Sequence, residues 1–305
     1  MRVSTTQIWG NAVNNLQAAQ DRQMKANEQV STQKVSTDLM GYGRSAEIIA
    51  SYQATLSNTN AFIDVNKTVS DRLDAQNIAL ERTSDAASQA KDAIMSALAS
   101  GDGSSLATAI QGAFSSSLDG LNYVHNGQYL FGGGNDDNPP VTVSTLTGLA
   151  NLTSVSSAFQ NGDVKKSSRI DVHTTLQTGM LASDLGTQLM TLFQQYQQQA
   201  TATPFGSQLD DTQKAFLTNL ANQFSQAYDG LVEQTSLNGT MQKRVENTQT
   251  SLQGQVTSLT SLISDRTDAD MAKAYSDLQI AQVSVQASAQ VLSSLKDTSL
   301  LNLLK

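Results

Sequence analysis

Residues 271–295, MAKAYSDLQIAQVSVQASAQVLSSL, contain neither proline nor glycine. Apolar or small side chains recur in this stretch at alternating spacings of three and four, which is the a/d pattern of a coiled coil. The pattern comprises Met271, Ala274, Leu278, Ala281, Val285, Ser288, Leu292 and Leu295. It predicts a helix with one apolar edge that must be covered by a partner helix.

A second, weaker apolar stripe runs beside the first, through Tyr275, Val283, Ala287 and Val291. One partner helix would leave this second stripe in water. The stretch therefore indicates a helix that packs against the N-terminus of its own chain and also against neighbouring copies.

The N-terminal segment repeats the spacing of three and four. Its apolar edge comprises Trp9, Ala12, Leu16, Ala19, Gln23, Ala26 and Val30, and only Gln23 interrupts it. The chain has only three prolines, all in its middle third, and proline costs roughly 3 kcal/mol inside a helix. We therefore expect long helices at both ends of the chain, paired with each other, and an insertion of another kind between them.

The segments between the two ends follow from similar signals. Residues 31–44 predict an irregular joint, and residues 45–99 predict a long helix that ends at Gly101-Asp102-Gly103-Ser104. A second joint is expected at Ser264–Asp270, opposite the first, because the apolar stripe changes phase there. The long helix has an apolar stripe with polar residues at seam positions, which fix register and partner. The polar seam residues are Asn66, Ser70, Asn77 and Ser84.

The centre of the chain reads differently. A helix whose apolar side runs from Leu106 to Val124 is expected. A short strand should follow it at Tyr129–Phe131. The runs Val141–Val143 and Arg169–Thr174 predict further strands. A helix from Leu181 to about Ala200 is expected to expose a glutamine-rich face. Two further signals are an N-cap at Asp210 or Asp211 and a turn at Leu237-Asn238-Gly239 before the last long helix.

The predicted fold class is mainly α. The N- and C-terminal segments form a long antiparallel helical bundle or coiled coil, with a small β-rich insertion in the middle. Three domains are expected. They are a terminal coiled-coil domain of residues 1–44 and 265–305, a helical rod of residues 45–131 and 180–264, and a small outer domain of residues 132–179.

Composition excludes several functions. The net charge of −8 and the pI of about 4.7 argue against a nucleic-acid partner. The chain has no cysteine, so neither a disulfide nor a thiolate metal site can form. The N-terminus lacks the apolar core of a signal peptide, and no 18-residue apolar run predicts membrane insertion.

No chemical site is predicted. His125 is expected at a helix end, and His173 on a strand has no second metal ligand at a suitable spacing. Residues 135–138 lack the spacing of a calcium loop, and residues 132–134 lack the lysine of a phosphate-binding loop. We interpret the basic cluster of Lys165, Lys166 and Arg169 as part of a solvated loop. We therefore predict no catalytic residue, no cofactor and no metal.

Several segments resemble the bacterial flagellin and flagellar hook-associated protein family. Gln29–Val35 is similar to the joint after the family's first arm, and Asp268–Ala272 to its C-terminal joint. The ending Ser299–Lys305 resembles the family's leucine-rich terminus. The opening Met1–Thr5, the segment Asn126–Gly133 and a small β insertion favour the FlgL type, the hook–filament junction protein. Gln33 stands where the family usually has glycine.

The resemblance implies a structural part of the extracellular flagellum and not an enzyme. It implies export, without a cleaved signal peptide, through the flagellar type III apparatus with an export chaperone. It also implies terminal arms that become ordered on assembly into a homo-oligomeric ring or tube, between a neighbouring hook-associated protein and flagellin. Flagellin proper remains an alternative, as does a carbohydrate- or ligand-binding module on the β insertion. The expected assembly interface comprises Trp9, Leu16, Val30, Met271, Leu278, Val285, Leu292 and Leu295.

Overall fold

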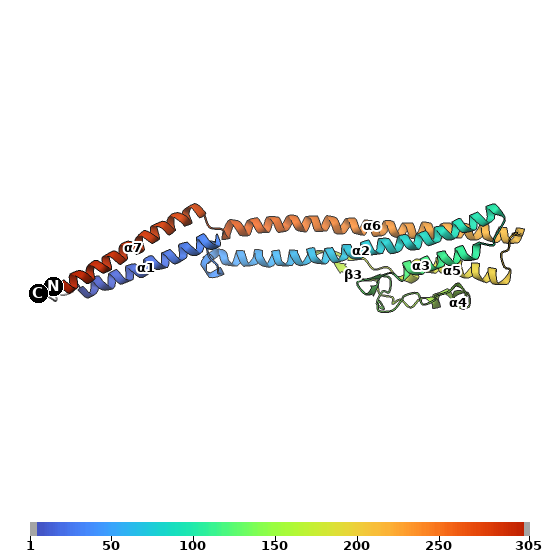
Figure 1. Ribbon diagram of the computed structural model, residues 1–305, viewed down its shortest axis with the longest axis horizontal. Coiled ribbons are helices and arrows are strands. Elements are labelled where there is room, and N and C mark those ends of the chain that lie inside the picture. The colour runs from blue at the N-terminus through green and yellow to red at the C-terminus, as the bar shows by residue number, and fades with distance from the viewer. Residues whose placement is uncertain (1–4, 302–305) are drawn as a thin grey trace. The chain divides into compact units, whose positions relative to one another are not determined.

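The computed structural model describes the backbone of residues 5–301 and the burial of residues 7–296 (Figure 1). Most of this backbone is helical, which confirms the mainly α fold class. The long helices are α1 (Thr5–Thr32), α2 (Ala46–Ser100), α3 (Leu106–Leu121), α5 (Ala182–Ala202), α6 (Asp211–Thr267) and α7 (Met271–Leu301). The short elements are the 3₁₀ helices η1 (Leu39–Ser45) and η2 (Val155–Ala158), helix α4 (Leu146–Ala150), and strands β1 (Val124–His125), β2 (Gln128–Tyr129), β3 (Ser167–Arg169) and β4 (Thr175–Gln177).

The chain divides into two compact units. One unit combines the two end segments, up to Asn58 and from Gly254 onward, and the other spans Thr59–Gln253. Both boundaries fall inside continuous helices, α2 and α6. We call the first the arm unit and the second the bundle unit.

In the arm unit, α1 and α7 run side by side in opposite directions (Figure 1). The buried positions of the pair are alanines: Ala12, Ala19 and Ala26 on α1, and Ala274 and Ala281 on α7. Small side chains at these positions let the two backbones approach closely. The predicted pairing of the two chain ends is therefore confirmed.

The two predicted joints meet within the arm unit. Lys34 and Asp268 form an isolated antiparallel bridge, and their side chains form an ion pair. The Val35 N–H donates to the Thr267 carbonyl oxygen over 2.8 Å, and the Ala269 N–H donates to the Gln33 carbonyl oxygen over 2.9 Å. The end of α1 is thus fastened to the start of α7 by backbone as well as side-chain bonds.

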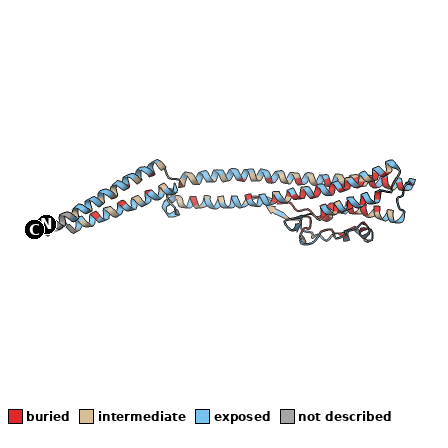
Figure 2. Cartoon of the chain, in the orientation of Figure 1, coloured by how far each residue is buried: buried red, intermediate tan, exposed pale blue. Residues whose placement is uncertain are grey.

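The bundle unit has a continuous apolar core between α2, α3, α5 and α6 (Figure 2). Three aromatic rings contact one another within this core. Phe193 meets Phe114 at 5.5 Å and Phe224 at 5.3 Å between ring centroids, both edge to face. Such pairs contribute roughly 0.5–1.5 kcal/mol each beyond their burial.

Polar side chains of the bundle unit cross between its elements. Asn66 donates from Nδ2 to the Ile170 carbonyl oxygen over 2.7 Å, so this polar seam residue bonds to the turn after β3 and not to a partner helix. Asn238 donates from Nδ2 to the Leu73 carbonyl oxygen over 2.8 Å and is fully buried. The turn predicted at Leu237-Asn238-Gly239 is therefore wrong. Helix α6 is continuous there, because the asparagine side chain serves an interhelical bond instead of a turn.

The insertion is a mixture of short elements. β1 pairs with β2 and β3 with β4, each antiparallel, around α4 and η2. The predicted small β insertion is confirmed as these two hairpins, but the boundaries differ. Residues 170–174 form the turn between β3 and β4, since the Asp171 carboxylate accepts the backbone N–H groups of His173 and Thr174. The expected strand at Val141–Val143 is reduced to one bridge, between Val141 and Phe159.

The insertion shares the core of the helices. Its buried residues Phe131, Leu146 and Leu149 belong to the same apolar cluster as Phe114 and Phe193. The predicted exposed glutamine face of α5 is partly wrong for the same reason. The side chain of Gln194 donates to the carbonyl oxygens of Leu149 and Leu152 at the end of α4, and that of Gln198 donates to Ala150.

Helix α6 begins with a reciprocal cap, as predicted for Asp210. The Asp210 carboxylate accepts the Gln213 N–H over 2.8 Å, and the Gln213 side-chain oxygen accepts the Asp210 N–H over 3.1 Å. Two backbone donors that the helix leaves free are satisfied in this way. The cap fixes where the long return helix of the bundle starts.

Candidate assembly interface

The eight residues predicted as an assembly interface all lie on the facing sides of α1 and α7. Each is partly buried in the single chain. They alternate along the seam with the fully buried alanines, as Leu278 does between Ala274 and Ala281. The structure therefore places them in the contact between the two arms of one chain. Their role in contacts between copies stays a prediction.

The opposite side of α7 is apolar and open to solvent. Ile280, Val283 and Val291 are 61%, 64% and 53% exposed, and Ala287 is exposed with them. Ile280, Val283 and Ala287 each lie two residues from a seam position, which is about 200° around the helix, and Val291 follows Ala287 at a spacing of four. We call these four residues the outer stripe of α7. Tyr275 of the predicted second stripe is also exposed, at 55%.

The sequence reasoning missed Ile280 in this stripe. Its signal is the offset of two from Leu278, which puts it in line with Val283 and Ala287 at spacings of three and four. The outer face of α1 has a different composition. The residues two positions before its seam are Gln7, Gly10, Asn14, Gln17, Asp21, Met24 and Glu28. Helix α1 thus has one apolar face, whereas α7 has two.

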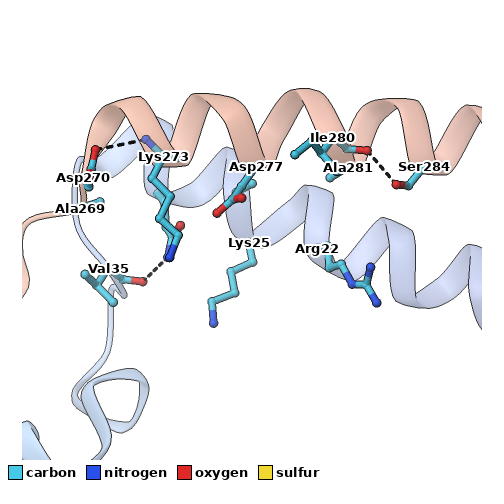
Figure 3. A pocket seen from close by; sticks show the side chains of 13 residues that line it. Arg22, Lys25, Val35, Ala269, Asp270, Lys273, Asp277, Ile280, Ala281 and Ser284 are labelled. Carbon is cyan, nitrogen blue, oxygen red and sulfur yellow. Dashed lines mark hydrogen bonds between the residues drawn. The ribbon is translucent and has the colours of Figure 1, made fainter.

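A groove of about 660 Å³ runs along one flank of the α1–α7 pair near the joint (Figure 3). Arg22 and Lys25 reach into it from α1, and Lys273 and Asp277 from α7. The Gln29 side chain closes its end by donating to the Val35 carbonyl oxygen over 3.0 Å. The groove carries charged side chains on both walls, and apolar residues such as Val35 and Ile280 also line it.

The joint carries the strongest local electrostatics of the arm unit. The Asp268 carboxylate accepts hydrogen bonds from Lys34, Ser264 and Thr267. The bond from Lys34 is the main reason that the pKa of Asp268 lies below its usual value, and the bond from Ser264 adds to it. The bridge is therefore charged at neutral pH. The two joints were predicted to face each other, but this ion pair was not predicted.

The other residues considered for chemistry are dispersed. His125 lies in β1, four residues past the end of α3, so the predicted contact with a helix end is wrong. His173 lies in the exposed β3–β4 turn. Lys165 pairs with Asp184 over 2.8 Å, and Lys166 pairs with Asp136. Within residues 5–301, no group of three histidine or acidic residues could hold a metal ion.

No helix in the described part of the chain has the length and apolar character needed to cross a bilayer. Two of the sequence motifs fall largely on residues that the structure does not describe, namely the opening Met1–Thr5 and the leucine-rich ending Ser299–Lys305. The two joint motifs and the Asn126–Gly133 segment lie within the described residues.

Comparison with known proteins gives one family and one fold. Residues 222–304 match the bacterial flagellin C-terminal helical region. A flagellar hook-associated protein from Vibrio parahaemolyticus has a similar structure, with 12% identity and a TM-score of 0.58 over 73% of this chain and 97% of that chain. FlgL from Bacillus cereus is also similar, with 17% identity and a TM-score of 0.54 over 71% of this chain and 98% of that chain. None of the curated protein sequences matches this chain.

The family match includes α7 and the later part of α6, where the outer stripe and the second joint lie. At such low identity the two structures show the fold alone. Together the findings confirm the resemblance to the flagellin and hook-associated proteins that the sequence predicted.

Proposed function

We infer that this flagellin-like chain is a structural component of the bacterial flagellum, a hook-associated junction protein of the FlgL type. The family match, the shared fold and the arrangement of the arms support this function. One observation carries it: the α1–α7 seam is closed within one chain, but the outer stripe of α7 is left in water. Apolar stripes of this kind are covered by other molecules in an assembly.

We further propose that neighbouring copies cover the outer stripe and build a ring or tube between a hook-associated protein and flagellin. Most of the stability of helices in proteins comes from packing of an apolar face and not from the helix alone. The larger residues of the α1–α7 seam are only partly buried in the single chain, so contacts in the assembly would add to the stability of the pair. Export through the flagellar apparatus, the help of a chaperone and a purely non-catalytic role belong to the same proposal.

We propose that residues 1–44 and 265–305 form the assembling arm domain, as the sequence predicted. Limited proteolysis of the dilute chain tests this. If the arms become ordered only on assembly, a protease should trim roughly residues 1–40 and 265–305 and spare the rest. Equal protection of the arms and the bundle in the dilute chain would contradict ordering on assembly.

The interface is tested by Leu292→Asp in a motile cell. Leu292 is partly buried in the seam, so a carboxylate there should prevent incorporation into the flagellum and abolish motility without unfolding the bundle unit. Gln290→Asp is the matched control, because Gln290 is exposed on the same helix. Normal motility with Leu292→Asp would count against the proposed interface.

Flagellin proper is the second candidate, because the matched family describes the flagellin C-terminal region. A fluorescent label on the chain separates the two in a motile cell. A junction protein should give one point at the end of the hook, whereas a flagellin should label the filament along its length.

A further inference from the structure

Two adjoining hollows lie on the arm unit, along α1 and the joint. The first has a volume of about 450 Å³ and lies between α1 and the joint, where Met24 and Met40 line it. The second, of about 420 Å³, continues along α1 past Gln17 and Gln20 and shares Asp21 and Met24 with the first. We call this continuous depression the joint hollow.

The joint hollow exposes large apolar side chains. Met40 is 87% exposed and Met24 is 64% exposed, and Leu39 and Val35 beside them are exposed as well. A cluster of this kind, surrounded by polar residues, marks an interaction site on a soluble protein. Methionine suits such a site because its flexible thioether adapts to partners of different shape.

The rim of the hollow is acidic. Asp21, Glu28 and Asp38 line it, and Lys25 is the one cation among its lining residues. Asp38 is occupied locally, since it accepts the Gly41 N–H, and Glu28 accepts the hydroxyl of Thr37. Asp21 makes no hydrogen bond or ion pair within the described residues, so its carboxylate remains free for a partner.

The hollow extends along α1, with its apolar lining of Met24, Val35 and Met40 near the joint and Gln17, Gln20 and Gln23 at its other end. Its residues on α1 run from Gln17 to Glu28, which is roughly 17 Å, or about three turns of a partner helix laid alongside. An amphipathic helix fits a groove of this kind by placing its apolar side chains inside and its charges at the rim. The three carboxylates of the rim, against one lysine, favour a basic partner.

We propose that the joint hollow binds a basic amphipathic helix supplied by another polypeptide. Its apolar side chains contact Met24 and Met40, and its lysine or arginine side chains pair with Asp21 and Glu28. The outer stripe of α7 takes no part in this contact, and the inference does not rest on the proposed assembly function.

The test uses the full chain and two labelled 18-residue peptides of equal positive charge. One is an amphipathic helix of leucine and lysine, and in the other serine replaces each leucine. Fluorescence anisotropy at about 0.15 M salt measures binding. Only the leucine-containing peptide should bind, and Met40→Gln should weaken that binding about tenfold, because one exposed apolar contact is lost. Asp21→Asn should weaken it severalfold.

Matched variants separate this site from general attraction to an acidic protein. Met95 is 53% exposed on α2 in the bundle unit, and Asp163 is exposed in the insertion. Met95→Gln and Asp163→Asn should leave the affinity unchanged. All four residues are exposed, so circular dichroism should show the same melting for each variant.

Three results would overturn the proposal. The serine peptide could bind as tightly as the leucine peptide, or Met40→Gln could have no larger effect than Met95→Gln. The third is self-association of the chain that Met40→Gln abolishes, with neither peptide bound. In that case a second copy, and not a basic helix, occupies the hollow.

Discussion

The arm unit and the bundle unit pack their long helices with side chains of different size. In the bundle unit, Phe114, Phe193 and Phe224 fill the core, and the insertion covers them with Phe131 and Leu149. In the arm unit, the fully buried seam positions are alanines, and the larger apolar residues of the outer stripe face water. The bundle buries its large apolar residues within one chain, whereas the arms leave several of theirs exposed, as the proposed assembly would require.

The contrast shows that large apolar residues are buried in the bundle unit, whereas several of those in the arm unit are exposed. Burying a large side chain contributes roughly 1.5–3 kcal/mol, and an alanine contributes much less. Helix α7 therefore places its bulkiest exposed residues, such as Ile280 and Val283, where they add nothing to the stability of the single chain. This pattern is expected when a helix must remain available for contacts between molecules.

The largest expected effect separates the two units directly. Phe193→Ala should lower the free energy of unfolding of the bundle unit by about 3–5 kcal/mol, because it leaves a cavity between two aromatic rings. Leu278→Ala in the arm seam should cost clearly less in the single chain, because Leu278 is only partly buried. Urea unfolding followed by circular dichroism reports the bundle, and fluorescence of Trp9, the only tryptophan, reports the arms. Equal losses for the two variants would remove the contrast between the units.

The next effect tests whether the insertion belongs to the bundle core. Leu149→Ala should lower the stability of the bundle unit by about 2–4 kcal/mol, since Leu149 is fully buried against the helices. Val164→Ala is the control, because Val164 is 69% exposed in the same insertion. The same urea titration measures both. A loss confined to the insertion, with the helices unaffected, would mean that the insertion folds separately.

A smaller effect of the opposite sign is expected at the joint. Gln33 has a φ of +59°, a left-handed conformation that favours glycine after a helix. Gln33→Gly should raise the stability of the arm unit by about 0.5–1 kcal/mol, as monitored by Trp9 fluorescence. Thr32→Gly, one residue earlier and still helical, should destabilise the arms instead. If both variants destabilise the arms, the strain at Gln33 is not what limits the joint.

The smallest effect at neutral pH concerns Tyr196. Burial raises the pKa of its phenol to about 12, from an ordinary value near 10, and its hydroxyl has no hydrogen-bond partner within the described residues. The neutral form is therefore favoured in the folded chain, and the bundle unit should lose stability as the pH rises from 10 to 12. Tyr196→Phe should be nearly neutral at pH 7 and should flatten this alkaline loss. An unchanged pH profile in the variant would assign the loss to other groups.

Periodicity made the arms predictable. The spacing of three and four located both seams, and the loss of phase at Ser264–Asp270 located the second joint. These signals depend only on which residues are apolar, and a two-helix contact needs nothing else. The ion pair of Lys34 with Asp268 was not predicted, because sequence alone does not say which side chains of two meeting joints come within reach.

The failures share a different cause. Asn238 and Gln194 are polar residues that usually lie in turns or on exposed faces, but both donate to backbone carbonyls of other elements. Their partners lie far away in the sequence, so local patterns give no sign of them. The run Arg169–Thr174 alternates like a strand, yet Asp171 caps a turn there. Local propensity does not predict the conformation where a hydrogen bond to a distant residue, or a capping hydrogen bond, determines it.

The central claim is that the outer stripe of α7 is open in one chain and covered in the assembly. The chain has no cysteine, so Val283→Cys introduces a single thiol whose labelling rate reports exposure without background. In the dilute chain this thiol should react nearly as fast as in the unfolded chain, because Val283 is 64% exposed. In chains incorporated into the flagellum the rate should fall by at least about tenfold. An unchanged rate after incorporation would contradict the account.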